Sequence, residues 1–321
     1  MGGILPKVSV IMPTYNAGPR IGAAIGGVLA QSHSDLELIV VDDGSTDDTH
    51  RIASGFGDRI TLVQQDNAGP NAARNAGIRA AGGEIIALCD SDDVLLPNYL
   101  ADALTVLGSS PARSWVTCAA LALTDHGLSE YGISPFGSIS PDDQREAILQ
   151  VNFVSIFSVF PRRMVDEVGY FSESLQRCED WDYWARSIFS GWRVAYQPKP
   201  AALYRQQGAS QSSDSAAMLD AEDSMIAGLT EVFEETFTSG ERELLAARAA
   251  RGSVDRQRLK ARRAWETGEF RSGARLLRTA AADYPHHRGL RRKAVIAGLV
   301  APVLELLPES FPLREKMRER W

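Results

Sequence analysis

Three carboxylates lie within four residues of one another, at Asp90, Asp92 and Asp93. They come directly after the apolar run 84–89, which predicts a buried strand. Carboxylates this close resist being ionised together, and Mg²⁺ or Mn²⁺ relieves the conflict because such ions bind one or two carboxylates together with phosphate oxygens. The alternative is a solvated acidic turn before a helix that begins near Pro97. A second acidic pair, at the end of another strand, favours the metal site.

That second acidic pair is Asp42-Asp43, which follows the apolar run 36–41. A carboxylate there can accept hydrogen bonds from a nucleobase N–H or from ribose hydroxyl groups. A turn with a helix N-cap is the alternative, because Asp, Gly and Ser favour both. Arg74 lies in the segment 67–75, about one turn inside an expected helix, where its guanidinium and the helix dipole could both meet phosphate. An exposed helical arginine is the other interpretation.

An acidic and aromatic segment lies far along the chain and begins Glu179-Asp180-Trp181. A carboxylate beside aromatic side chains can have its pKa raised, as a general base requires, and the aromatic rings could stack on a sugar. The alternative is a helix N-terminus with Asp at the cap and the rings facing the core. The residues alone leave both interpretations open.

Apolar runs and helical segments alternate along the first part of the chain. The predicted strands are 8–12, 36–41, 60–64 and 84–89, and the predicted helices are 20–30, 46–54, 70–81 and 97–107. This alternation indicates a doubly wound α/β sheet with parallel strands, in which ligands bind beyond the carboxyl ends of the strands. The polar clusters 14–16, 42–43 and 90–93 all follow strands, so we expect them to converge on one edge of the sheet.

The pattern loosens after residue 110. The predicted elements there are strands 115–123, 155–160 and 193–196 and a helix over 180–190, with helices dominating from Asp214 onward. The spacing of small and apolar residues over 264–280 resembles one helical hairpin of the tetratricopeptide type. A single hairpin is not an array, so we interpret it as packing.

The ordered set of motifs resembles that of the family 2 inverting glycosyltransferases, whose catalytic domain has a GT-A fold. The motifs are VSVIMPTYN at 8–16, VDDGSTD at 41–47, NAG at 75–77, DSDD at 90–93 and ED at 179–180. The resemblance covers about residues 6–210, and the order of the motifs is far more specific than any one of them. It implies a Rossmann-like GT-A nucleotide-sugar-binding domain over 1–212, followed by a mostly helical, basic C-terminal region over 213–321.

The resemblance also implies a role for each matching residue. The nucleotide-binding residues would be Pro13, Thr14, Tyr15, Asp42, Asp43, Arg74, Asp90 and Ser91, the metal ligands Asp92 and Asp90, and the catalytic pair Asp180 as base with Glu179 in support. Further candidates are Asp93, Trp181, Arg205 and Gln207. Gln207 stands where many members carry the histidine of a Tyr-Arg-x-His segment, so a metal or phosphate contact at that position is weakened here.

The implied reaction is a metal-dependent, inverting sugar transfer from a nucleotide diphosphate sugar, usually UDP-linked, to an acceptor hydroxyl. The acceptor would be a carbohydrate or a lipid-linked molecule of surface polysaccharide or glycoconjugate synthesis, and the cofactor Mg²⁺ or Mn²⁺. A sugar nucleotidyltransferase is one alternative, but its glycine-rich basic loop is missing, because residues 14–20 contain only Gly18 and Arg20 of those types. A non-catalytic nucleotide-sugar-binding protein is the other alternative, which Asp92 and Asp180 argue against.

Composition restricts the class of protein. Hydrophobic residues make up 44% and charged residues 23% of the 321 residues, which excludes a disordered, collagen-like or disulfide-scaffold chain. Cys89, Cys118 and Cys178 form no CxxC pair and are expected to be small buried side chains rather than a zinc site. No window reaches the roughly 20 apolar residues of a membrane-spanning helix, and no secretory signal is visible, so we expect a cytoplasmic protein.

Charge is distributed unevenly along the chain. Residues 241–321 contain 19 Lys and Arg against 10 Asp and Glu, a net charge of +9, whereas the whole chain has −7, which argues against a nucleic-acid partner. Residues 291–307 begin Arg-Arg-Lys and continue with a short apolar run that contains Pro302. One interpretation is a helix packed on the hairpin around Trp265. The other is an interfacial segment through which the enzyme makes peripheral contact with the inner face of the membrane.

Overall fold

The computed structural model describes residues 6–124, 127–133, 138–206, 215–283, 288–307 and 312–320. The chain divides into two compact units, of which the first comprises Met1–Ser213 with Ser224–Thr236. The second comprises Asp214–Asp223 with Phe237–Trp321. One of the boundaries, between Asp223 and Ser224, lies within a single helix, α8 (Ser215–Phe233), and the first boundary follows the predicted end of the catalytic domain at residue 212.

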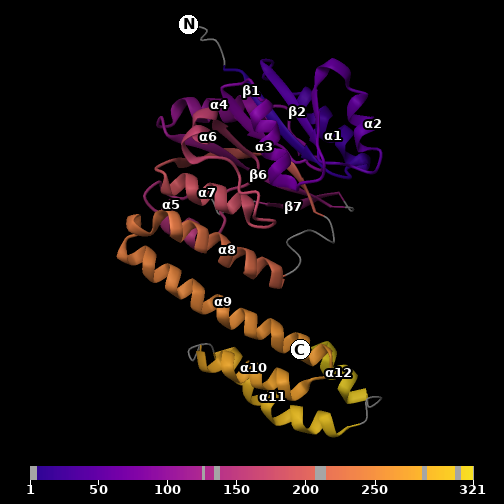
Figure 1. Ribbon diagram of the computed structural model, residues 1–321, viewed down its shortest axis with the longest axis vertical. Coiled ribbons are helices and arrows are strands. Elements are labelled where there is room, and N and C mark those ends of the chain that lie inside the picture. Colours follow the sequence, from indigo (N-terminus) through magenta and orange to yellow (C-terminus); the bar gives the residue numbers. More distant parts are fainter. Residues whose placement is uncertain are drawn as a thin grey trace. The chain divides into compact units, whose positions relative to one another are not determined.

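Strands and helices alternate through the first unit (Figure 1). Its first half contains β1 (Val8–Thr14), α1 (Gly18–Leu29), β2 (Leu36–Asp42), α2 (Thr49–Ser54), β3 (Thr61–Gln64), α3 (Pro70–Ala80), β4 (Ile85–Leu88), β5 (Val94–Leu95) and α4 (Tyr99–Ser109). Its second half contains β6 (Ser114–Thr124), β7 (Gly127–Ile133), α5 (Gln144–Gln150), β8 (Ser158–Pro161), α6 (Arg162–Val168), α7 (Glu179–Phe189) and β9 (Arg193–Arg205).

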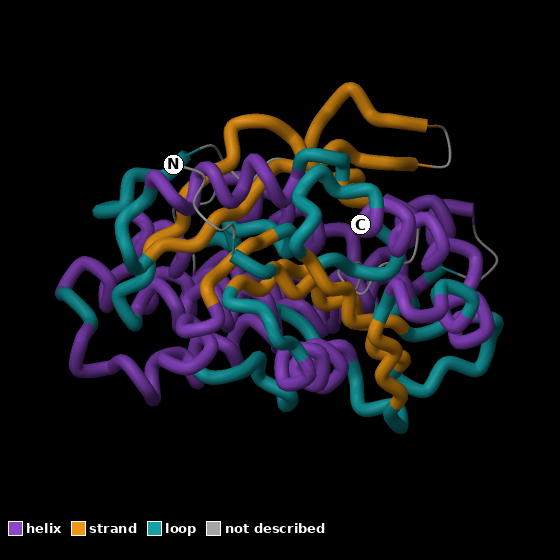
Figure 2. Tube along the Cα trace, turned by 90° about the horizontal axis from the view of Figure 1, so that it is seen from above, coloured by secondary structure: helices purple, strands orange, loops and turns teal. Residues whose placement is uncertain are grey.

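One mixed sheet runs through this unit in the order β3-β2-β1-β4-β8-β6-β9-β5, with β7 paired to β6 (strands are orange in Figure 2). The strands β1 to β4 are parallel, which confirms the α/β prediction for the first half. Pro13 does not end β1 as its ring would suggest. The strand continues to Thr14 because β4 pairs with β1 only as far as Ile11, so the missing N–H of Pro13 costs no ladder bond on that side.

The second half departs from a purely parallel sheet. Strand β8 is antiparallel to both β4 and β6, and β5 is antiparallel to β9. The predicted strand 193–196 is too short, since β9 runs to Arg205. Its pairing with β6 shifts register between Cys118 and Ala120, opposite the stretch that contains Pro198 and Pro200. Proline disfavours regular pairing, so the sequence there does not look like a strand.

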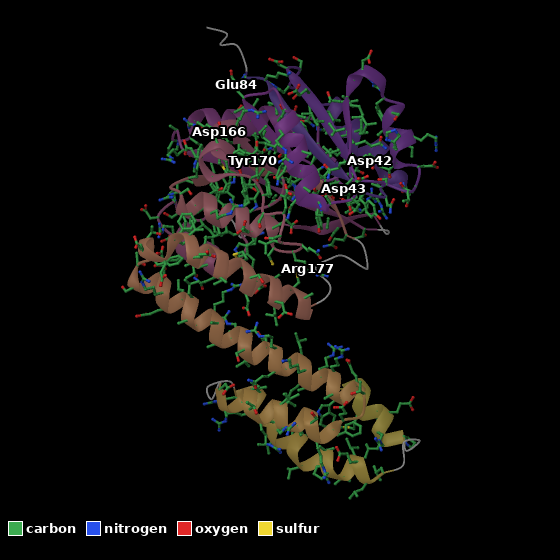
Figure 3. All side chains as sticks on the ribbon, in the orientation of Figure 1. Asp42, Asp43, Glu84, Asp166, Tyr170 and Arg177 are labelled. Atoms are coloured by element: carbon green, nitrogen blue, oxygen red, sulfur yellow. The ribbon has the colours of Figure 1, made fainter. Side chains whose placement is uncertain are left out.

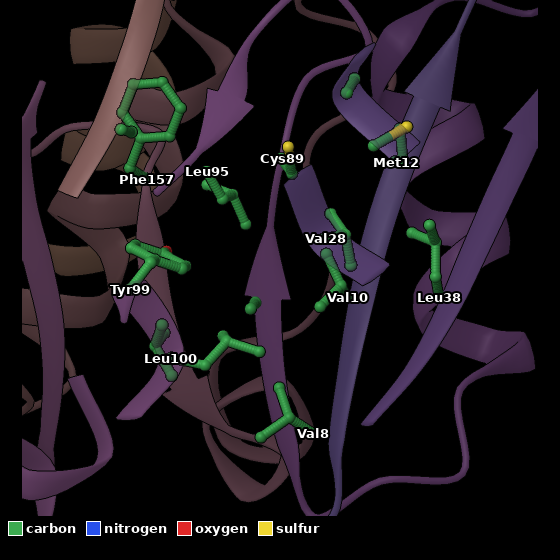
Figure 4. Close-up of a cluster of buried hydrophobic side chains, with 14 of the residues drawn as sticks. Val8, Val10, Met12, Val28, Leu38, Cys89, Leu95, Tyr99, Leu100 and Phe157 are labelled. Carbon is green, nitrogen blue, oxygen red and sulfur yellow. The ribbon is translucent and has the colours of Figure 1, made fainter. Parts of the chain in front are cut away.

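Helices cover both faces of the parallel strands. Val8, Val10 and Met12 face a core shared with α1 and α4, as Figure 4 shows around β1. Ile11 faces α3 instead, and a Cβ atom on Gly77 would lie 2.5 Å from the Ile11 side chain, so only glycine allows α3 to pack this closely on the sheet. All three cysteines are buried and unbridged, as predicted.

The second unit is helical, as expected for the C-terminal region. It contains α9 (Ser239–Glu266), α10 (Phe270–Asp283), α11 (Arg288–Leu306) and α12 (Pro312–Arg320). Trp265 is fully buried at the α9–α10 turn, with its ring 5.1 Å from that of Phe270. A Cβ atom on Gly273 would lie 2.2 Å from the Trp265 ring, which explains the small residue at this position. The predicted hairpin therefore packs its two helices around Trp265.

Candidate functional site

A cleft of about 970 Å³ lies beyond the carboxyl ends of β1 and β4. It brings together most of the residues that the sequence singles out. They are Pro13, Thr14, Tyr15, Asp43, Arg74, Asp90, Ser91, Asp92, Asp93, Glu179 and Arg205. Asp42, Asp180 and Trp181 are not among the lining residues, and Gln207 lies outside the described residues.

The two aspartates at the end of β2 have different surroundings (labelled in Figure 3). Asp42 is fully buried, and its carboxylate accepts the Ser45 N–H and lies 3.2 Å from Nδ1 of His50. Asp43 lines the cleft, although its oxygens also accept the N–H groups of Ala68 and Gly69. Asp43 is therefore accessible from the cleft, whereas Asp42 stabilises the turn.

The turn after β1 forms one wall of the cleft. Asn16 has a left-handed backbone with φ 49°, and its side-chain oxygen accepts the Thr46 N–H at 2.9 Å. This bond ties the turn after β1 to the turn after β2. The predicted helix start at 46 is wrong for the same reason, because the segment 45–48 bonds to this turn and α2 begins only at Thr49. Tyr15 also lines the cleft, and about half of its surface is exposed.

The surroundings of Arg74 differ from those of the exposed helical arginine that was the alternative interpretation. It is 3% exposed rather than a surface arginine. Its Nη2 lies 3.3 Å from Asp90 and its Nη1 3.8 Å from Glu179, so it joins two acidic motifs that are far apart in sequence. The Phe171 ring lies beneath the guanidinium at 5.1 Å. Within the described residues its Nε has no hydrogen-bond partner, although it lies beside the cleft.

The acidic cluster after β4 is fastened to the end of β9. The Arg205 N–H donates to Asp93 at 2.8 Å, and its Nε donates to the carbonyl oxygen of Asp92 at 3.1 Å. Burial, together with the charge of Asp90, raises the pKa of Asp93 to about 8 and that of Asp92 to a lesser extent. The raised pKa values mean that ionisation of these carboxyl groups is unfavourable without a nearby positive charge. A cation bound beside them would stabilise their ionised form.

The donor set fits a hard divalent cation that is shared with a ligand. In the described part of the chain, no three His, Cys, Asp or Glu side chains form a cage that could hold a metal ion by themselves. Asp90 and Asp92 both line the cleft and supply carboxylate oxygens. Mg²⁺ and Mn²⁺ commonly take one or two carboxylates and complete their coordination with substrate phosphates. The residues present therefore fit a metal that arrives with a phosphorylated substrate.

Glu179 and Asp180 begin α7, and Glu179 lines the cleft. Burial and the neighbouring Asp180 raise the pKa of Glu179 to about 7, against the opposing effect of Arg74. Burial also raises the pKa of Asp180. Asn152 donates to Asp180 at 3.0 Å, and its amide is oriented because its oxygen accepts the Val154 N–H. A carboxyl pair with raised pKa values can accept a proton near neutral pH.

The aromatic residues after this pair belong to the core. Trp181 is 7% exposed, and its indole N–H donates to the Ile148 carbonyl at 2.7 Å. Tyr183 and Trp184 are fully buried. The alternative interpretation of this segment, in which the rings face the core, is therefore the one that the structure supports, and Trp181 is not placed to stack on a sugar.

Two asparagines that carried no individual prediction hold the site together. Asn71 donates to the carbonyls of Ser172 and Leu175, and Asn75 exchanges hydrogen bonds with the backbone of Phe171. These bonds fasten the segment before α7 to α3, the helix that carries Arg74. Asn75 belongs to the NAG motif, but no sequence pattern shows what either asparagine binds, because their partners lie about a hundred positions away.

Other lining residues were also missed. Arg20 on α1, Asn67 before α3, and Glu173 and Arg177 before α7 all line the cleft. Arg177 is labelled in Figure 3. None belongs to a recognisable cluster, and only the fold brings them together.

Comparison with protein families gives an independent result. Residues 9–167 match the model of the family described as glycosyl transferase family 2. The succinoglycan biosynthesis protein ExoO of Rhizobium meliloti is 31% identical over 235 residues, which are 70% of this chain and 67% of that protein. An uncharacterised glycosyltransferase of Rickettsia prowazekii is 30% identical over 191 residues, 56% of this chain. The match spans only 58% of the length of that relative.

Solved structures share the fold. TarS 1–349 of S. aureus, determined in complex with UDP, matches with a TM-score of 0.60 and 19% identity over 92% of this chain and 90% of that one. The mannosyltransferase PcManGT of Pyrobaculum calidifontis, in complex with GDP-Man and Mn²⁺, matches with a TM-score of 0.56 and 20% identity over 96% and 89%. These likenesses confirm the predicted glycosyltransferase fold of the GT-A type with its helical C-terminal region.

Proposed function

Because this chain belongs to the family 2 glycosyltransferases, we propose that it transfers a sugar from a nucleotide diphosphate sugar to an acceptor hydroxyl group. The observation that carries the proposal is Arg74, which lies between Asp90 and Glu179 in a single cleft. In that position Arg74 would link a phosphate-binding side of the cleft to a proton-accepting side, as a displacement reaction needs. The name of the ExoO relative supports an acceptor that belongs to polysaccharide synthesis.

The donor would lie along the wall formed by Pro13, Thr14 and Tyr15. The exposed ring of Tyr15 offers a surface for a nucleobase, and Asp43 offers carboxylate oxygens for base or ribose. Arg74 would meet the diphosphate, with Arg205 nearby. A UDP donor is the proposal, supported by the UDP complex of TarS, whereas PcManGT was solved with GDP-Man.

A divalent cation, Mg²⁺ or Mn²⁺, would be held by Asp92 and Asp90. Bound there, it would neutralise charge on the leaving nucleoside diphosphate. The Mn²⁺ complex of PcManGT supports metal use. The pKa of Asp92 is raised by burial and by Asp90, so a neighbouring positive charge would stabilise the ionised form of this carboxyl.

The chemical step would be one displacement at the anomeric carbon. The acceptor oxygen forms the new bond to that carbon while the bond from carbon to the diphosphate oxygen breaks, and the hydroxyl proton passes to Asp180. The nucleoside diphosphate leaves with the bonding electrons. No covalent enzyme intermediate is needed, so the anomeric configuration inverts. Glu179 would support Asp180 by holding Arg74 in place, 3.8 Å away.

Product release from a panel of nucleotide sugars tests the proposed function. We expect nucleoside diphosphate to be released from a UDP-sugar in the presence of Mn²⁺, faster with a carbohydrate or lipid-linked acceptor, with an inverted anomeric centre in the NMR spectrum of the product. Nucleotide binding alone decides nothing, because a non-catalytic binding protein of this fold also binds. Binding of UDP-sugars without turnover across the whole panel would support that non-catalytic alternative.

Asn152→Ala should shift the pH dependence of the reaction. Asn152 donates to Asp180 and thereby lowers its pKa, so its loss raises that pKa further. Because the base acts only when deprotonated, the acidic limb of the kcat/KM profile should move to higher pH, and raising the pH should restore part of the activity. A general structural defect would lower activity equally at all pH values. An unchanged limb would remove Asp180 or Asn152 from the proposed mechanism.

A further inference from the structure

Helix α11 in the second unit has two unlike faces, and only one is packed (yellow in Figure 1). Its small and apolar residues Leu290, Ala294, Ala297, Ala301 and Leu304 are buried in the core with α9 and α10. On the other side Val295, Ile296, Leu299, Val303 and Leu306 are 39 to 81% exposed. Their spacing of three or four residues places them in one stripe along the helix, which we call the α11 stripe.

Basic residues mark the beginning of the same helix. Arg288 and Arg292 precede Val295 and Leu299 by seven residues each, which is two helical turns, so they lie in line with the stripe. Arg291 and Lys293 lie beside them, and no acidic residue is present in the first turn. Positive charge at a helix N-terminus opposes the helix dipole. Helix stability therefore does not explain these four residues.

A groove of about 660 Å³ runs beside the stripe, between α10 and α11. Its floor is apolar, with Ala281, Ala294 and Leu299 among the lining residues, and Arg278 and Arg291 line it as well. A Cβ atom on Gly298 would lie 3.1 Å from the Arg278 guanidinium, so this arginine extends across α11 at a glycine. The acidic residue of α11, Glu305, is paired with Arg271 at 2.8 Å. The surface thus combines apolar area with basic side chains.

We propose that the α11 stripe docks on an anionic lipid membrane, with the arginines at its N-terminal end contacting lipid phosphate groups. An amphipathic helix with basic residues beside its apolar face lies in the plane of the boundary between headgroups and acyl chains. Guanidinium groups bind phosphate with paired hydrogen bonds. Among the described residues no helix is long and apolar enough to cross a membrane, and Pro302 lies inside α11. The mode is therefore peripheral.

Charge distinguishes this partner from a second copy of the chain. Two stripes facing each other in parallel would bring the arginines at the start of each helix together, where like charges repel. An anionic bilayer instead complements them, and each basic residue strengthens such attachment severalfold. The inference does not depend on the proposed reaction, because its readout is binding to lipid.

Co-sedimentation of the full chain with vesicles tests the inference. We expect pelleting with phosphatidylcholine vesicles that contain phosphatidylglycerol at low salt, and little pelleting at high salt or with phosphatidylcholine alone. Val295→Ser/Leu299→Ser should weaken binding about tenfold or more, and Arg288→Gln/Arg292→Gln about as much. Hydrogen exchange of the unmodified protein should show lipid-induced protection in α11. All substituted residues are exposed, so the fold should persist, as a thermal unfolding scan would verify.

Matched variants control for loss of apolar surface and of charge. Val232→Ser removes an apolar side chain that is 66% exposed on α8, and Arg251→Gln/Lys260→Gln removes two exposed charges from α9. Both should pellet like the unmodified protein. The inference is wrong if the protein stays in the supernatant at low salt, or if the stripe variant pellets normally. Sedimentation equilibrium gives the remaining outcome: a dimer that the stripe variant dissociates, without lipid binding, would mean that a second copy covers the stripe.

Discussion

Replacing Asp180 with asparagine should reduce turnover by about 10² to 10⁴ while leaving the affinity for UDP nearly unchanged, because a general base contributes a factor of that size. The amide keeps the shape of the carboxylate and one hydrogen-bond acceptor for Trp181. It loses the ability to take a proton. Asp180 is not among the residues that line the cleft, so donor binding should be unaffected. Single-turnover kinetics and calorimetric titration with UDP measure the two quantities separately.

Two companion variants locate the base within this segment. Glu179→Gln should weaken donor binding as well as turnover, because Glu179 lines the cleft and lies 3.8 Å from Arg74. Asp182→Asn should leave catalysis intact, since the Asp182 carboxylate is buried and paired with Arg186 at 2.8 Å. If Asp180→Asn retained more than about a tenth of the activity, the factor expected of a general base would be missing, and Glu179 would become the stronger candidate.

Asp92→Ala should abolish the dependence on Mg²⁺ or Mn²⁺ together with most of the activity, a loss of about 100-fold or more. The carboxylate lies in an acidic cluster whose charge is costly without a cation, as the raised pKa of Asp92 indicates. We expect UDP affinity to increase with added metal in the unmodified protein and to show no such increase in the variant. Calorimetric titration of UDP with and without Mn²⁺ is the measurement.

The matched control is Asp93→Asn, which also removes one carboxylate from the cluster. Asp93 accepts the Arg205 N–H through one oxygen, and an asparagine oxygen can do the same, so its metal dependence should persist. Full activity in excess EDTA, with the metal shown to be absent from the protein, would contradict a metal-dependent reaction.

The sequence predicts the first half of the catalytic domain well because β1, β2 and β4 are nearly continuous apolar runs that are mostly buried. Strand β4 is an example, bounded by glycines before it and aspartates after it. Strand β5 could not be predicted, because Val94 and Leu95 form a strand only through pairing with β9. The antiparallel position of β8 likewise depends on which strand lies beside it, and no local pattern encodes that choice.

The same distinction applies to the candidate site. Clusters next to strand ends were recognisable because the acidic residues are adjacent in sequence. The burial of Arg74 was not, because its environment comes from Phe171 and Glu179, on segments that the loop contacts of Asn71 bring near. Trp181 is the opposite case, because the sequence suggested a site residue and the structure places its ring in the core. An aromatic residue beside a carboxylate gives the same sequence pattern in both situations.

The attachment of the acidic loop to β9 also sets the order in which this domain can become functional during synthesis. The residue that fastens the loop, Arg205, is made 112 positions after Asp93. A chain made only as far as β4 and the acidic loop after it therefore has the Arg74–Asp90 contact but lacks the contacts of Asp92 and Asp93 with Arg205. The family match ends at residue 167, yet a chain that stopped there would lack both α7 and the strand that closes the loop. The contacts that complete the acidic loop can therefore form only after Arg205 has been synthesised.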